Sequence, residues 1–236
     1  MISLFFTCSF TGMIKSALSA VLLTLIILTG IFLTFFISKL LSVTILKGFP
    51  SSFSLELPPY RKPQILKTIY RSVFDRTLHV LARAVITAAP AGALIWILAN
   101  VTIGPSSLLS YLTDFLDPFG RIIGMDGVIL MAFILGFPAN EIVIPLILMS
   151  YLSLDHMTEY ESIYALKHIF IENNWTWLTA LCVMIFSMFH WPCATTCLTI
   201  KKETGSLLWT FAAFLIPTVT GLLLCFLISA CAGLFL

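Results

Sequence analysis

The sequence predicts an all-α, polytopic helical membrane protein with two proline-broken segments that are candidates for re-entrant turns. Of its 236 residues, 59% are hydrophobic and only 10% are charged, whereas soluble domains carry about 25% charged residues. The apolar residues lie in long runs without charge, and about 18 such residues suffice to cross the hydrocarbon layer as a helix. These runs are 16–38, 84–113, 142–154, 173–200 and 204–236. They lack the two-residue alternation of barrel strands, so helices are favoured.

Three regions follow from the distribution of charge. Residues 1–40 are expected to form an N-terminal transmembrane helix, which is longer than the apolar core of a signal peptide. Residues 41–83 hold most of the basic side chains and are expected to be a cytoplasmic loop followed by an amphipathic helix at the membrane surface. Its apolar positions include Leu78 and Leu81. Residues 84–236 are expected to form a transmembrane domain with broken helices near 136–141 and 190–195.

The run from Gly127 to Leu152 contains the first break. The loops on either side of it, 114–126 and 153–172, are both acidic and both look external. A single crossing would place them on opposite sides of the membrane, so the sequence favours a segment that turns back at Gly136–Glu141. The second break, at His190–Cys193, interrupts a run that ends at Lys201 and Lys202. Paired, proline-broken segments indicate a transport site near the midplane.

Glu141 and Asn140 are the polar candidates at the first break. A charged side chain at membrane depth costs at least about 2.5–3.5 kcal/mol, so it usually lines a pathway or has a partner. Glu141 is therefore either a pathway residue or an interfacial residue that extends its carboxylate to water or pairs with an arginine. Asn140 is either a ligand or only a cap for the next helix. The prolines also predict unpaired carbonyls, for instance at Ile134, if the preceding helix extends to Pro138.

His190, Cys193 and Cys197 are the candidates at the second break. Cys193 and Cys197 are four residues apart and share one face of any helix that starts there. Thiolate, imidazole and carboxylate ligands suit a transition metal such as iron(II) better than magnesium or calcium. Packing without ligation is the alternative for each of the three residues.

Four stretches identify the family. Residues 126–152, DGVILMAFILGFPANEIVIPLILMSYL, and residues 175–206, WTWLTALCVMIFSMFHWPCATTCLTIKKETGS, closely resemble the C-terminal membrane region of ferrous iron transport protein B. The segments ELPPYRKPQ at 56–64 and DPFGRIIG at 117–124 fit the same family in the same order. The resemblance covers most of the chain from about residue 56. It implies that Cys193 matches a cysteine of the second Gate motif on the iron path, and that Asn140 and Glu141 match its GFPANE element.

The resemblance also implies a function and partners. The family joins a GTP-binding module to a membrane domain with two Gate halves and moves iron(II) inward, so iron(II) is expected as transported substrate and no cofactor as permanently bound. No phosphate-binding loop is present, so the chain is not expected to be an enzyme. We expect a permease subunit of the inner (plasma) membrane that contributes half of the iron(II) path. Its expected partners are the lipid bilayer and a GTPase-bearing first half in trans, with a homo-oligomer as a further candidate and no nucleic acid.

Several alternatives remain at this point. The chain could be one product of a split transporter or a truncated remnant. A Gate-type transporter of a nucleoside keeps transport but changes the cargo, and manganese or zinc would accept the same ligands as iron. A non-transporting assembly subunit predicts tolerance of substitution at both breaks. An intramembrane enzyme would use His190 and Cys193 as a base and a thiol, but no third orienting group is evident.

Overall fold

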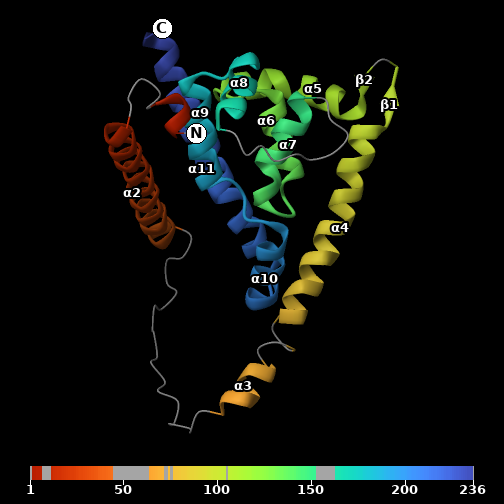
Figure 1. The fold of residues 1–236 in the computed structure, drawn as a ribbon. Coiled ribbons are helices and arrows are strands. Elements are labelled where there is room, and N and C mark those ends of the chain that lie inside the picture. Colours follow the sequence, from red (N-terminus) through yellow and green to blue (C-terminus); the bar gives the residue numbers. More distant parts are fainter. Residues whose placement is uncertain are drawn as a thin grey trace.

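A computed structural model describes residues 2–6, 12–44, 64–71, 74, 77–104, 106–152 and 163–235. It is built of helices with a single hairpin of two-residue strands (Figure 1). In chain order the elements are α1 (Ile2–Phe5), α2 (Gly12–Thr44), α3 (Ile65–Arg71), α4 (Leu78–Asn100), β1 (Thr102–Ile103), β2 (Ser106–Ser107), α5 (Leu108–Ile122), α6 (Gly127–Leu135), the 3-10 helix η2 (Asn140–Ile142), α7 (Val143–Tyr151), α8 (Ile163–Glu172), α9 (Trp177–Phe189), α10 (Ala194–Thr204) and α11 (Leu207–Phe235).

Four stretches of the described chain are long and apolar enough to cross a membrane. They are Gly12–Thr44, Val80–Asn100, Trp177–Thr204 and Leu207–Gly233, the third being α9 and α10 together. The predicted all-α polytopic fold is therefore confirmed. The uncharged run 84–113 is not one helix, because α4 ends at Asn100 and the hairpin β1–β2 precedes α5. Gly104 makes that turn with a φ of +71°, a value that glycine adopts without strain.

The basic region departs from the expected boundary. Most of 41–83 lies outside the described residues, but Leu78 and Leu81, which were expected in the amphipathic helix, lie in the first turn of α4, whose candidate span begins at Val80. The helix is unbroken from Leu78 to Asn100, and its basic residue, Arg83, lies within its first two turns. The helix can therefore begin before residue 84 without placing a charged residue near its middle. The described part of the surface helix is α3, with seven residues and Arg71 in its last turn.

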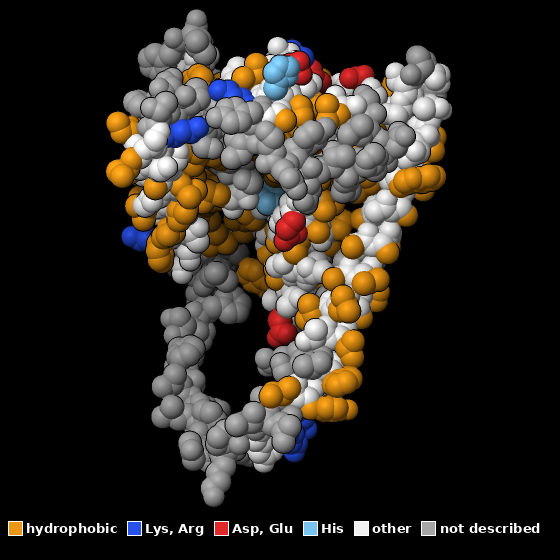
Figure 2. Space-filling view, viewed as in Figure 1, with side chains coloured by type: hydrophobic (Ala, Val, Ile, Leu, Met, Phe, Trp, Pro, Cys, Tyr) orange, Lys and Arg blue, Asp and Glu red, His pale blue; other side chains and the backbone are white. Residues whose placement is uncertain are grey.

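Figure 2 shows acidic, basic and histidine side chains gathered at one end of the molecule, further charged side chains toward the other end, and a few at mid-height among hydrophobic side chains. At the end of the molecule that holds α5 and α8 are Asp114, Asp117, Arg121, Lys167, His168 and Glu172. At the opposite end, α3 carries Lys67 and Arg71, and α10 ends with Lys201, Lys202 and Glu203. The basic end is the one that the positive-inside rule assigns to the cytoplasm.

The segment α6–α7 is a helical hairpin, the arrangement expected for the predicted re-entrant segment. Most residues of both helices are buried, with Ile129, Phe133, Leu146 and Ile147 at most 2% exposed. They start and finish at the same, α5-bearing end of the molecule (Figure 1). The turn that the sequence analysis placed in GFPANE is confirmed, since α6 ends at Leu135 and α7 begins at Val143. The second broken segment does not turn back: α10 continues away from α9, and the two together make one candidate span.

Three side chains, Asp126, Tyr151 and Trp175, fasten the two ends of this hairpin, and we call them the hairpin latch. The Tyr151 hydroxyl donates to Asp126 Oδ2 and accepts from Trp175 Nε1 at 2.7 Å. Asp126 Oδ1 accepts the Ile129 N–H at 2.7 Å and so caps α6. The latch therefore joins the start of α6, the end of α7 and the segment that leads into α9.

Replacing Tyr151 with Phe tests the latch. The change leaves Asp126 and Trp175 each without one partner, and hydrogen bonds to a charged group contribute about 1.5–3 kcal/mol. We expect a loss near the lower value, about 1.5 kcal/mol of unfolding free energy, because Asp126 keeps its bond to Ile129 N. Titration with SDS in mixed micelles measures it. Tyr70→Phe on the exposed face of α3 is the control. Equal stability of the two variants would show that the latch contributes nothing.

Candidate functional site

The first break is a tight turn after α6. Gly136 ends the helix, and a Cβ there would lie 2.6 Å from Val143 Cγ2 and 2.9 Å from the Ala132 carbonyl oxygen, so the two arms approach closely only because this residue is glycine. Phe137 N donates to the Ile134 carbonyl at 3.3 Å. The expected free carbonyl at Ile134 is therefore wrong: α6 stops before Pro138 can remove a donor.

The second break is an extended segment between α9 and α10. His190 ends α9, its N–H donating to the Phe186 carbonyl at 2.7 Å, and its backbone is extended (φ −70°, ψ 173°). Cys193 precedes α10 in a similar conformation (φ −62°, ψ 161°). Pro192 lies between them and disfavours helical backbone at Trp191. The residues between α9 and α10 therefore have an extended backbone in place of helical hydrogen bonds.

The two breaks lie against each other. Ala194 N, the first amide of α10, donates to the Phe137 carbonyl in the hairpin turn at 2.9 Å. The ring centroids of Phe133 and His190 are 5.3 Å apart. Ala194 lies inside the third candidate span, so the hairpin turn lies beside that span. Segments more than 50 positions apart in the sequence thus form one polar centre in an apolar surrounding.

His190 presents one free ring nitrogen. Its Nδ1 lies 2.9 Å from the Ser187 carbonyl oxygen, which can only accept, so Nδ1 carries the proton. The other nitrogen, Nε2, is buried and has no hydrogen-bond partner among the described residues. A backbone carbonyl that fixes the tautomer in this way is the usual support of a metal-binding histidine. The same arrangement also suits a histidine that accepts a hydrogen bond.

Asn140 and Glu141 begin the 3-10 helix that leads into α7. Asn140 Oδ1 is buried and, within the described part of the chain, has no hydrogen-bond partner, so a capping role through this oxygen is not seen. Glu141 is exposed and has no ion pair in the described residues. At membrane depth such a carboxylate needs water, a cation or a polar partner. Both residues therefore carry side-chain oxygen atoms for which the described residues show no partner.

The two cysteines are in different environments. Cys193 Sγ lies 3.1 Å from the hydroxyls of both Thr195 and Thr196. Cys197 Sγ donates to the Pro192 carbonyl at 3.6 Å. Cys197 thus satisfies a backbone group of the break, whereas Cys193 is held by side chains at the start of α10. The threonines were not among the expected site residues, although ATT directly after Cys193 was a visible signal.

The aromatic side chains around the breaks were also not anticipated. Trp191 stacks on Phe214 of α11 with ring centroids 5.7 Å apart and an interplanar angle of 12°. Phe137 meets the same ring edge-on at 5.9 Å. Both breaks are therefore packed against α11. Trp191 Nε1 is buried without a hydrogen-bond partner in the described residues, which adds an unpaired donor beside the two unpaired acceptors.

The described residues contain no group of three or more His, Cys, Asp or Glu side chains that could hold a metal ion together. The five expected ligands, Asn140, Glu141, His190, Cys193 and Cys197, come from two segments that touch, but they do not form a closed metal centre. Their assignment as ligands stays a prediction.

Two protein-family models match the sequence of this chain. Residues 81–207, more than half of the chain, match the Gate family, described as "Nucleoside recognition", and residues 6–76 match the family "Ferrous iron transport protein B C terminus". The chain belongs to the ferrous iron transport protein B family. The second match lies largely before residue 56, so the family likeness extends further toward the N-terminus than the four quoted stretches. No solved structure matches the chain.

Curated FeoB relatives align over nearly all of the chain. The protein named "Fe(2+) transporter FeoB" from Staphylococcus aureus strain MSSA476 is 32% identical over 231 residues, which is 94% of this chain and 33% of the relative. Those of the same name from Leptospira biflexa and Leptospira interrogans are 26% identical, over 84% and 81% of this chain and 31% and 30% of their own lengths. The chain spans about a third of the length of these relatives and corresponds to the C-terminal membrane region of a FeoB.

Proposed function

We propose that the chain supplies one side of an iron(II) path across the membrane, at the contact between the two broken segments. The hydrogen bond from Ala194 to Phe137 is the observation that carries this proposal, because it brings the candidate donors of both breaks to one depth. Relatives named Fe(2+) transporter support iron as the cargo.

The donors suit a transient path. Asn140 Oδ1 and His190 Nε2 are buried without partners in the described residues, and Cys193 adds a sulfur atom. Oxygen, nitrogen and sulfur together favour a transition metal over magnesium or calcium. Conduction requires binding that is weak enough to release the ion. Separate ligand atoms along the break can each replace one water molecule of the ion. Such an arrangement binds the ion more weakly than a closed metal centre would, and so allows its release.

The proposed path also needs protein that is not part of this sequence. Since the relatives are about three times as long as this chain, we propose that the other side of the path and the GTP-binding part are supplied by further protein, either in trans or on the same chain. The membrane is proposed to be the inner (plasma) membrane, with the basic end bearing α3 and the end of α10 in the cytoplasm.

Uptake of radioactive iron(II) in cells that lack other importers tests the proposal. The chain is expressed alone and together with a GTPase-bearing first half, and uptake is expected only with both. Cys193→Ser and His190→Gln are each expected to lower the uptake rate about tenfold, which corresponds to about 1.4 kcal/mol of lost binding in the path. Cys231→Ser, at an exposed position of α11, is the matched control and keeps full uptake.

Other cargoes are separated in the same cells. If Cys193→Ser, His190→Gln and Glu141→Gln all keep wild-type uptake, the assignment of the path is wrong. If manganese or zinc enters faster than iron, the cargo is wrong while the path stands. Nucleoside uptake without metal uptake would favour the description of the Gate family instead.

A further inference from the structure

The last helix, α11, divides at Pro217 into an exposed half and a buried half. Residues 207–217 are all partly buried or exposed. The buried positions of the described helix all follow the proline, and they are Thr218, Gly221, Cys225 and Ala232. They are three, four and seven residues apart, so they lie along one face of the helix.

The buried half of α11 is fastened to α9. A Cβ at Gly221 would lie 3.1 Å from Phe186 Cδ2 and 3.2 Å from the Phe189 carbonyl oxygen, so the two helices approach closely at this glycine. One turn further on, Cys225 Sγ donates to the Cys182 carbonyl at 3.4 Å. This half of α11 therefore belongs to the fixed body of the molecule.

Pro217 weakens α11 at the boundary between the two halves. It has no N–H to donate to the Ala213 carbonyl, and its ring crowds that oxygen. Beside it, Thr218 donates its hydroxyl to the Phe214 carbonyl at 2.6 Å. Bonds of this kind often bend helices. The helix is therefore easiest to bend where its fixed half begins.

The exposed half of α11 forms one unit with α10, and we call residues 194–216 the α10–α11 arm. No residue of α10 is buried. Gly205 ends α10 with a φ of +62°, and its N–H donates to the Lys201 carbonyl at 3.0 Å. Ser206 N donates to Thr204 Oγ1 at 3.3 Å. Hydrogen bonds therefore hold the turn between the two helices of the arm.

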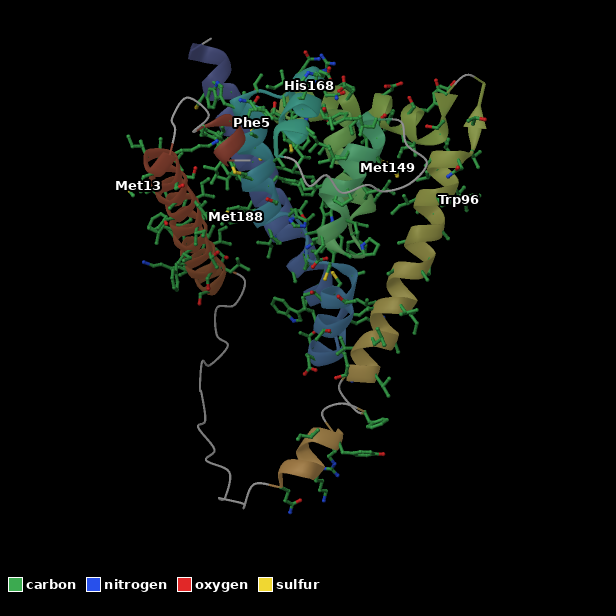
Figure 3. All side chains as sticks on the ribbon, in the orientation of Figure 1. Phe5, Met13, Trp96, Met149, His168 and Met188 are labelled. Atoms are coloured by element: carbon green, nitrogen blue, oxygen red, sulfur yellow. The ribbon has the colours of Figure 1, made fainter. Side chains whose placement is uncertain are left out.

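The arm joins the rest of the chain at two interruptions that lie at one level. One is the extended segment His190–Cys193, and the other is Pro217. Phe214, just before the proline, stacks on Trp191 with ring centroids 5.7 Å apart. Figure 3 labels Met188 near the end of α9, and the arm extends from that level toward the end of the molecule that bears α3 (Figure 1). Neither connection is an unbroken, proline-free helix.

The arm touches the hairpin turn through Ala194 and Phe214. Ala194 N donates to the Phe137 carbonyl at 2.9 Å, and the Phe214 ring meets the Phe137 ring edge-on at 5.9 Å. On its other side, α10 lies against α4. We propose that the arm swings as one unit about the second break and Pro217, so that its far turn moves most and its contact with Phe137 changes. Hinges of this kind are a few residues that absorb the change in backbone angles. The inference concerns conformation and does not depend on iron as the cargo.

Double electron–electron resonance measures the swing. The full chain is placed in nanodiscs of phosphatidylethanolamine and phosphatidylglycerol, and spin labels are attached through p-acetylphenylalanine because native cysteines react with thiol labels. Leu208 and Leu227 are matched positions of α11, 71% and 56% exposed, nine residues before and ten residues after Pro217. Each is paired with a second label at Phe115 of α5, which is 69% exposed. We expect the distance distribution from position 208 to be at least twice as wide as that from position 227.

Two prolines provide a matched pair of variants. Pro217→Ala restores a donor for the Ala213 carbonyl and is expected to narrow the distribution from position 208 to the width of that from position 227. Pro90→Ala makes the same change inside α4 and leaves the distribution unchanged. Equal widths from the two positions in the wild type, or a Pro217→Ala distribution as wide as that of the wild type, would overturn the proposal. The comparison within the wild type decides it if Pro217→Ala fails to fold.

Discussion

Gly127→Ala is expected to prevent stable folding of the α6–α7 hairpin. A Cβ at Gly127 would overlap the carbonyl oxygen of Thr113 and lie 2.7 Å from Asp117 N and 2.9 Å from Asp117 Cα. These are backbone atoms of α5, which cannot move away as a flexible side chain could. The Gly127 N–H also donates to Asp117 Oδ1 at 3.2 Å, and that bond needs the same close approach. Overpacking typically costs 1–3 kcal/mol, so we expect about 3 kcal/mol or more here.

The yield of monodisperse protein in detergent and its unfolding in SDS measure the effect. Gly92→Ala in α4 is the matched control, because a Cβ there meets nothing within 4 Å. Alanine is the better helix former by about 1 kcal/mol, so the control should be unchanged or slightly more stable. A Gly127→Ala protein with the stability of the control would contradict the close packing of α5 against α6.

Ala194→Pro should uncouple the two breaks. Ala194 is the first residue of α10, where proline fits a helix well, and Cys193 already has the extended backbone (φ −62°, ψ 161°) that a residue before proline requires. The main loss is the N–H that donates to the Phe137 carbonyl. An unsatisfied buried acceptor costs about 1–3 kcal/mol, and the proline ring adds a steric clash at the same oxygen. We expect about 3 kcal/mol in total.

Ala194→Ser keeps the N–H and separates this effect from a general intolerance of substitution. SDS unfolding measures stability, and iron uptake in the assembled transporter measures function. We expect the proline variant to lose both and the serine variant to keep both. A proline variant that is stable but transports no iron would show that the hydrogen bond is needed for transport and not for stability. One that retains both would show that the breaks do not depend on this bond.

The sequence was sufficient to predict the fold and the location of both breaks. Charge-free runs and the two acidic loops led to the α6–α7 hairpin, because membrane topology depends on local composition. The boundary at Leu78 was missed for the same reason: the basic residues around it resembled a surface helix, and only continuous helical backbone assigns it to α4.

The candidate site could be predicted only residue by residue. GFPANE and HWPC located Asn140, Glu141, His190 and Cys193, but no spacing rule brings Phe137 to Ala194 or directs the free nitrogen of His190. Those depend on side-chain rotamers and on α11 packing against both breaks through Phe214. The different environments of Cys193 and Cys197 likewise follow from where α10 begins and not from the number of residues between them.

The bond between Ala194 and Phe137 couples the hydration of the contact to its separation. In hydrocarbon, separating its donor from its acceptor exposes both, and a cost of about 1–3 kcal/mol reduces the population of the separated state by a factor of roughly 5 to 150. Water or a cation that reaches the Phe137 oxygen removes that cost. Wetting of the contact and separation of the two segments are therefore linked equilibria: each raises the probability of the other, and a dry contact stays closed.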